Sequence, residues 1–285
     1  MRKRFGFTIV ELLTALVIIA LLVGLLIPAM SMVRKIAKET AQKHQFTTID
    51  MALMAFKNDY GDYPPSEWRP PAEDYCGAQK LAEALLGWDL MGFHPDSDFR
   101  SNGWNDAGDY IYDPNNPAYF DQRRGPYLEL ATTNAFRLGN IPINKPGLFD
   151  DTGLLAPDTF VICDVFGIKK IPIGGKMVKA GTPILYYKAN TSSKTMVDPF
   201  WDKRIYSAYD NLPLIELGKM TDGEQHGLVK DKNGDGDPDL YSFDYDGGIR
   251  DPKVGIPWPY RPDSYILISA GADGLYGTSD DIRNF

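Results

Sequence analysis

The chain has 285 residues, 44% of them hydrophobic, so it is long enough to bury the core of one large or two modest domains. Its 38 acidic residues outnumber its 30 basic ones, and the formal net charge is −8. No basic run occurs after residue 45. Nucleic-acid binding is therefore disfavoured, because a protein that holds phosphates presents a concentrated basic surface.

An uncharged segment lies near the N-terminus. Residues 12–32 carry no charged side chain, and as a helix they would span about 32 Å, close to the hydrocarbon thickness of a bilayer. A removable secretory signal has an apolar region of only about 7 to 15 residues, and a buried core helix is seldom uncharged over this length. We therefore expect one transmembrane helix. Basic residues stand on both sides of the segment, so the positive-inside rule leaves its orientation open.

Glu11 stands just inside this apolar region. An ionisable side chain within a membrane costs about 2.5 to 3.5 kcal/mol on insertion scales, so it usually marks a paired or functional group. The alternative is a glutamate at the headgroup interface, where the cost is small.

The residues before Glu11 are Gly6, Phe7 and Thr8, and they follow a basic tripeptide. This pattern resembles the class III signal of type IV prepilins and type II secretion pseudopilins. The resemblance implies that a prepilin peptidase cuts between Gly6 and Phe7 on the cytoplasmic side and methylates the new amine of Phe7. It also implies that Glu11 neutralises the amine of a neighbouring subunit in a filament, where a matched pair is tolerated and a lone charge is not.

The N-terminal helix should continue beyond the membrane. Pro28 lies within the apolar segment, where it should kink or loosen the helix, and the resembled family has a proline at this distance. An apolar stripe with helical spacing follows, formed by Phe46, Ile49, Leu53, Phe56 and Tyr60. Gly61 is a plausible C-terminal cap, and Pro64 and Pro65 prevent continuation.

Residues 61–160 are rich in proline and in turn-forming residues, which predicts a loop-rich insertion with one short helix at 78–86. We interpret Trp68, Trp88 and Trp104 as buried anchors for these loops, with a recognition surface as the alternative. Strand patterns at 160–163, 183–187 and 264–269 then predict an antiparallel sheet.

Three segments, 164–167, 182–187 and 269–274, resemble successive landmarks of the major pseudopilin (G-type) of type II secretion systems. The resemblance implies an α+β, type IV pilin-like fold in which a long N-terminal transmembrane helix packs on a C-terminal antiparallel sheet and a large loop-rich insertion separates them. The expected divisions are a leader (1–6), the helix (7–60, with 7–32 in the membrane), the insertion (61–160) and a β-rich region (161–285).

Two acidic loops suggest calcium. Asp231, Asn233, Asp235 and Asp237 alternate as in the first half of an EF-hand loop, although Ser242 stands where a bidentate Glu is expected. The alternative for this loop is a solvated acidic turn.

The second loop offers Asp273, Asp280 and Asp281, hard oxygen ligands that suit calcium better than zinc. Major pseudopilins bind calcium in the corresponding final loop, so the resemblance implies a calcium site here.

The chain has two cysteines, Cys76 and Cys163, which permit one disulfide in an oxidising compartment or two separate thiols. We find no Gly-x-Ser-x-Gly elbow, phosphate-binding loop or His-Glu-x-x-His motif, and we predict no enzyme activity.

We therefore expect a structural subunit of a type II secretion pseudopilus or type IV pilus-like filament. The alternative is a low-copy tip minor pilin or adhesin that acts as a membrane-tethered binding module. The resemblance implies a single-pass protein of the bacterial inner membrane with its large domain periplasmic or extracytoplasmic. Its expected partners are copies of itself, other pilin-like subunits, prepilin peptidase, the inner-membrane assembly platform and, before assembly, membrane lipid.

Overall fold

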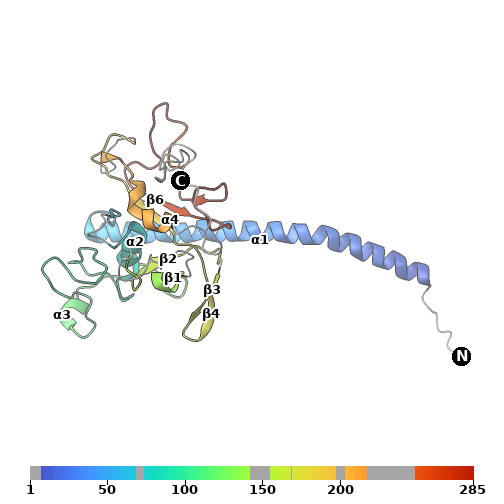
Figure 1. Ribbon diagram of the computed structural model, residues 1–285, viewed down its shortest axis with the longest axis horizontal. Helices are drawn as coiled ribbons and strands as arrows, with labels where there is room; N and C mark the ends of the chain where they lie inside the picture. Colours follow the sequence, from blue (N-terminus) through green and yellow to red (C-terminus); the bar gives the residue numbers. More distant parts are fainter. Residues whose placement is uncertain (1–7, 69–73, 142–154, 168, 197–202, 217–247) are drawn as a thin grey trace. The chain divides into compact units, whose positions relative to one another are not determined.

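The computed structural model describes residues 8–68, 74–141, 155–167, 169–196, 203–216 and 248–285. They belong to two compact units, Met1–Ala41 and Gln42–Phe285. One helix, α1 (Ile9–Tyr60), has residues in both units (Figure 1).

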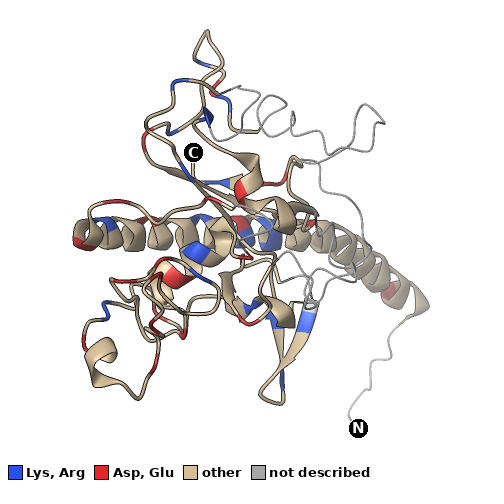
Figure 2. Ribbon diagram, turned by 60° about the vertical axis from the view of Figure 1, so that its left-hand side comes forward, with Lys and Arg blue, Asp and Glu red and all other residues tan. Residues whose placement is uncertain are grey.

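Within Met1–Ala41 the described chain is almost entirely α1, which continues through Pro28. Residues 8–38 are exposed along their whole length. Figure 2 shows Lys, Arg, Asp and Glu spread over the other unit, whereas the first part of α1 is almost free of them. This stretch consequently finds no protein core to cover its apolar side chains within its own unit.

The end of α1 lies in the unit Gln42–Phe285 and matches the sequence prediction. The last helical residue is Tyr60, and Gly61 follows with φ 87°, a left-handed conformation that glycine adopts without steric cost. The N–H of Gly61 donates to the carbonyl of Lys57 at 2.7 Å, so it satisfies one of the free carbonyls at the helix end.

The other elements follow in chain order: α2 (Gly77–Leu86), α3 (Pro117–Phe120), β1 (Ala135–Arg137), η1 (Leu138–Asn140), β2 (Phe160–Ile162), β3 (Lys169–Ile173), β4 (Lys176–Ala180), β5 (Leu185–Lys188), η3 (Ala208–Asn211), α4 (Leu212–Glu216), β6 (Tyr265–Ser269) and β7 (Ile282–Arg283). The predicted helix at 78–86 is confirmed as α2. The three predicted strands are confirmed as β2, β5 and β6, each within one or two residues of its expected bounds.

The strands form antiparallel ladders in the orders β1-β2, β3-β4 and β5-β6-β7. β2 continues toward β5 through an isolated antiparallel bridge between Cys163 and Pro183, next to a hydrogen bond from the N–H of Ile184 to the carbonyl of Ile162 (2.8 Å). The predicted antiparallel arrangement is therefore confirmed, although β2 takes β1 as its ladder partner.

Strand β6 is buried on both faces, and its side chains alternate between two apolar clusters. Tyr265 and Leu267 join the cluster that contains the apolar stripe of α1, whereas Ile266 and Ile268 join the cluster on the other face. Burial on both faces explains the continuous apolar run of this strand. The C-terminal half of α1 thus packs on an antiparallel sheet, which confirms the α+β, pilin-like fold.

The helix α2 is buried along its whole length and contacts β2 and β5. Part of the loop-rich segment 61–160 therefore belongs to the same core as the sheet. The buried-anchor interpretation is confirmed for Trp68 and is wrong for Trp104, which is 45% exposed, while Trp88 is half-buried and donates to the carbonyl of Ser101 at 2.7 Å. Cys76 and Cys163 are buried free thiols. Of the two alternatives, one disulfide or two separate thiols, the structure therefore has the two separate thiols.

Candidate functional site

The first described residues form a reciprocal cap at the start of α1. The hydroxyl oxygen of Thr8 accepts the N–H of Glu11 at 3.2 Å. In return, Oε2 of Glu11 accepts both the N–H and the hydroxyl of Thr8 at 2.8 Å. This is the capping box of a Thr-x-x-Glu sequence, which satisfies two N–H groups that a helix start otherwise leaves free.

The cap gives Glu11 a second role beside the one expected from sequence. A carboxylate in the first helical turn is stabilised by the helix dipole, so Glu11 is held at the N-terminal end of its own helix. Thr8 was not predicted to have this role, although the Thr-x-x-Glu spacing is a readable signal for it. The expected processing residues, Gly6 and Phe7, lie outside the described residues.

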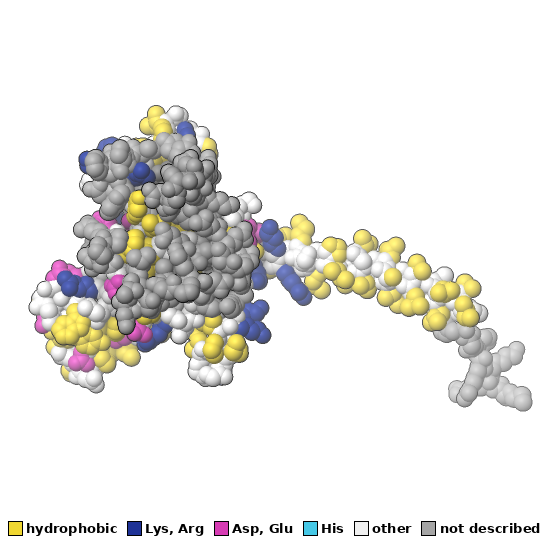
Figure 3. Space-filling model, viewed as in Figure 1, with side chains coloured by type: hydrophobic (Ala, Val, Ile, Leu, Met, Phe, Trp, Pro, Cys, Tyr) yellow, Lys and Arg dark blue, Asp and Glu magenta, His cyan; other side chains and the backbone are white. Residues whose placement is uncertain are grey.

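The stretch that follows the cap exposes apolar side chains at almost every position, so no side of the helix is polar. Figure 3 shows these side chains along the face in view. A helix of this kind is stable only when a bilayer or other helices cover it. Within the described part of the chain, α1 is the one helix long and apolar enough to cross a membrane. Pro28 lies within this stretch, and its carbonyl accepts the hydroxyl of Ser31 at 2.8 Å.

The three segments with pseudopilin-like landmarks come together around one buried carboxylate, that of Asp164. Its Oδ1 accepts the N–H groups of Phe166 (3.1 Å) and Thr182 (3.2 Å), and its Oδ2 accepts the hydroxyl of Ser269 (3.1 Å). Side chains that are far apart in the sequence therefore share one hydrogen-bonded centre, beside the bridge that joins β2 to the start of β5.

The final loop is organised by Asp280. Its Oδ2 accepts the N–H groups of Ala272 (2.7 Å) and Asp273 (3.0 Å), and its Oδ1 accepts the hydroxyl of Thr278 (2.5 Å). The carboxylate of Asp273 accepts the N–H of Leu275 at 2.8 Å. The carboxylates of Asp273 and Asp280 lie within hydrogen-bonding reach of each other, and burial together with this contact raises the pKa of Asp273.

Asp281 points elsewhere. Its Oδ2 accepts the N–H of Gly277 (3.0 Å) and a guanidinium N–H of Arg283 (3.2 Å), while its Oδ1 is buried without a hydrogen-bond partner. The side chain is 2% exposed, and burial raises its pKa to about 6.

As a cation site, this loop fits in part. Asp273 and Asp280 present adjacent oxygens, but no three Asp, Glu, His or Cys side chains among the described residues converge into a group that could hold a metal ion. The residues of the other acidic loop, Asp231, Asn233, Asp235 and Asp237, lie outside the described ranges.

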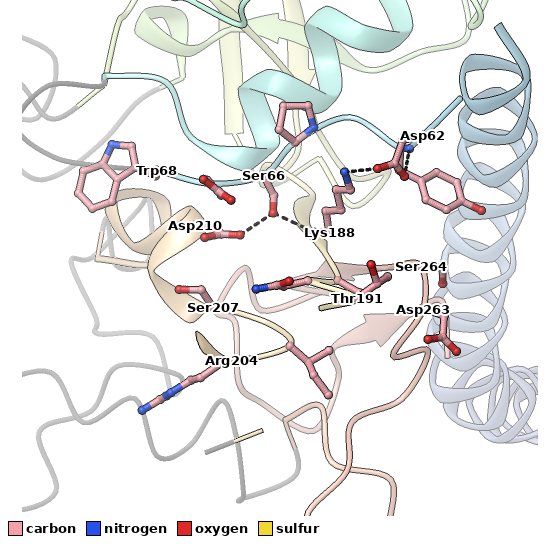
Figure 4. Close-up of a pocket in the computed structure, with 16 residues that line it drawn as sticks. Asp62, Ser66, Trp68, Lys188, Thr191, Arg204, Ser207, Asp210, Asp263 and Ser264 are labelled. Carbon is pink, nitrogen blue, oxygen red and sulfur yellow. Dashed lines mark hydrogen bonds and ion pairs between the residues drawn. The ribbon is translucent and has the colours of Figure 1, made fainter. Parts of the chain in front are cut away.

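The Gln42–Phe285 unit also contains a polar cavity of about 410 Å³ (Figure 4). Ser66 donates to Asp210 at 2.5 Å and accepts the N–H of Lys188 at 2.9 Å, and the Lys188 ammonium pairs with Asp62 at 2.6 Å. No histidine is among the described residues that line it. The Ser66–Asp210 pair therefore lacks the general base of a hydrolase triad, and these polar groups bind one another.

Comparison with known proteins adds one finding. Residues 1–27 match the family model of the prokaryotic N-terminal methylation motif. This match indicates a type IV pilin-like substrate of prepilin peptidase, and the long apolar helix fits membrane anchoring. No curated protein and no solved structure is significantly similar to the chain.

Proposed function

We propose that the chain is a structural subunit of a type II secretion pseudopilus or a type IV pilus-like filament. The observation that carries this proposal is the Thr8–Glu11 cap at the start of a helix that is apolar on all sides. An anchor of this kind is covered by lipid before assembly and by the helices of neighbouring subunits afterwards.

The finer assignment is the G-type pseudopilin. It is supported by the resemblance of three segments to landmarks of that family and by their hydrogen bonding around Asp164. In this proposal the chain is an inner-membrane protein with its large unit outside the cytoplasm. Its partners are copies of itself, other pilin-like subunits and the assembly platform.

The second candidate is a low-copy tip pilin or adhesin. The polar cavity near Trp68 and the loop-rich segment 61–160 favour it, because a binding module needs a surface beyond what assembly requires. Counting copies per filament separates the two candidates: a filament subunit is present in many copies, and a tip subunit in few.

The assembly test separates the two roles of Glu11. Glu11→Gln retains the capping box, since glutamine also serves at this position, but it cannot neutralise a neighbour's amine. We expect this variant to insert into membranes normally and to give few filaments, measured as the sheared filament yield relative to membrane-bound protein.

Thr8→Ala is the matched variant. It removes the cap at a cost of about 0.5 to 2 kcal/mol in helix stability but keeps the Glu11 charge, so we expect filaments to form. If Glu11→Gln gives wild-type filament yield, the charge-pairing role is wrong. If Thr8→Ala fails as badly as Glu11→Gln, the cap is itself required for assembly and the Glu11 charge is not sufficient for it.

We also propose that calcium binds the final loop through Asp273 and Asp280, with Asp281 joining them once its side chain turns away from Arg283. The loop at Asp231, Asn233, Asp235 and Asp237 is a second, separate site in this proposal. The close approach of Asp273 and Asp280 supports the first site, because a divalent cation would offset their mutual repulsion. Backbone carbonyls would complete the coordination.

Calcium that binds only the folded state stabilises it by about 2.7 kcal/mol at a hundredfold excess over Kd. Chelation should therefore lower the melting temperature of the full chain in detergent, and Asp280→Asn should remove most of this effect. Asp263→Asn, at an exposed aspartate outside both loops, is the control. A melting temperature insensitive to chelator, together with no calcium by elemental analysis, would refute both sites.

A further inference from the structure

The hairpin formed by β3 and β4 is an isolated pair of strands. Among the described residues these strands pair only with each other. Gly174 and Gly175 make the turn with φ 54° and 77°, the positive values that a two-residue type I′ hairpin turn requires. The outer edges of both strands are therefore without a strand partner among the described residues.

Its root is buried and its outer part is exposed. Ile171 and Ala180 lie in the core of the Gln42–Phe285 unit. Farther out, the register places Met177 opposite Pro172, and Met177 is 62% exposed, while Ile173 and Val178 are both more than one third exposed. Apolar side chains are thus presented to solvent at the end of the hairpin (Figure 3).

Lysines surround these apolar side chains. Lys170 and Lys179 are opposite each other in the ladder, Lys176 stands next to the turn, and all three are exposed. No acidic residue occurs from 165 to 197, although the whole chain carries a net charge of −8. A basic and apolar element on an acidic protein is complementary to an anionic lipid surface, where phosphates attract lysines and the acyl boundary accepts apolar side chains.

The hairpin is attached to a part of α1 that lies only a few turns along the chain from the uncharged segment. Just before β3, the N–H of Val165 donates to the side chain of Gln42 at 3.0 Å, and the side chain of Gln45 donates to the carbonyl of Cys163 at 3.0 Å. Gln42 follows Met32, the end of the uncharged segment, by ten residues, which is about 15 Å of helix. A strand of five residues reaches about 17 Å, so the length of chain allows the hairpin to touch the headgroups.

We propose that the β3–β4 hairpin docks on an anionic bilayer surface and inserts Met177 and its apolar neighbours at the headgroup boundary. This inference rests on the proposed membrane anchoring by α1. Docking would hold the large unit against the membrane before assembly, and extraction of a subunit into a filament would have to break it.

The test uses the full chain in nanodiscs at one protein per disc. Met177→Cys carries an environment-sensitive dye, since Cys76 and Cys163 are buried, and nitroxide lipids report contact by quenching. Met91→Cys, at another exposed methionine of the same unit, is the matched control. We expect quenching at 177 but not at 91, stronger with phosphatidylglycerol than with phosphatidylcholine alone, and weaker at high salt.

Replacing Lys170 and Lys179 by glutamine should lower the docked-to-free ratio by about thirtyfold, because each lysine near an anionic surface contributes about a factor of five. Nanodisc flotation measures α1 insertion separately. If the chain does not float, the proposed anchoring fails. If the chain floats and the dye at 177 is not quenched by nitroxide lipids, the lipid-docking proposal is overturned. If the dye leaves water only when several copies share a disc, the proposal is also overturned, and the hairpin is assigned to a contact between subunits.

Discussion

At the scale of residues, a buried polar network links α2 to the loop that follows it. Oε1 of Glu83 accepts the hydroxyls of Ser97 (2.5 Å) and Tyr112 (2.8 Å). His94 is 0% exposed, its Nδ1 accepts the N–H of Asp96 (3.1 Å), and its Nε2 is buried without a partner. Burial lowers the pKa of His94; the charge of Asp96 opposes this shift and that of Arg123 adds to it.

This histidine predicts a loss of stability in acid. Because the folded state lowers the pKa of His94, its imidazole is neutral when folded, and the unfolded chain takes up a proton first as the pH falls below about 6.5. The penalty is absent above that pH and grows until the pH reaches the folded-state pKa. His94→Gln removes it, so the variant should be less harmful at pH 5 than at pH 7.5, measured by denaturant unfolding of the full chain in detergent.

Two comparisons isolate the effect. Burial raises the pKa of Glu83, which favours the folded state in acid and so opposes His94; the difference between wild type and His94→Gln cancels that contribution. His44→Gln, at an exposed position of α1, is measured in parallel as the control for replacing a histidine. A wild-type to His94→Gln difference that stays constant from pH 7.5 to pH 5 would contradict the prediction.

At the scale of elements, the sequence predicted those helix positions that depend on neighbouring residues in the chain. The apolar stripe from Phe46 and the glycine at position 61 fixed the end of α1, and the spacing of Leu81 and Leu85 located α2. The hairpin of β3 and β4 was missed because its exposed lysines interrupt the apolar alternation, although the pair Gly174-Gly175 is itself a hairpin signal. Strands of two or three residues, such as β1 and β7, owe their pairing to tertiary context and leave no periodicity to detect.

The directions in which the side chains of the candidate sites point could not be predicted from the sequence. Glu11 was recognised as the unusual charge, whereas its hydrogen bonds to Thr8 follow from the geometry of the first helical turn. Asp280 and Asp281 are neighbours in the chain, yet one meets Asp273 and the other meets Arg283. Successive residues near a short strand point to opposite sides, so adjacent aspartates need not share a ligand.

At the scale of the whole molecule, the two parts of α1 suit different surroundings. Its first part is exposed and apolar on every side, and its last part is amphipathic and buries one face against the sheet. The only charges expected at the start of the anchor are the basic tripeptide and Glu11. Removal of Arg2, Lys3 and Arg4 would change the formal net charge from −8 to −11 and would create a new amine on Phe7.

Processing is therefore the prediction that concerns the entire molecule. The methylation motif spans residues 1–27, and the peptidase is expected to act at the Gly6-Phe7 bond, where a small residue must precede the cut. Mass analysis of membrane-extracted protein should show a chain that begins at methylated Phe7. Gly6→Ala should be cut nearly as well, whereas Gly6→Val should accumulate with its leader attached, because a branched side chain does not fit where glycine does. A chain that retains Met1 in the presence of active peptidase, or one that begins near Ser31, would contradict the pilin-like processing on which assembly through α1 depends.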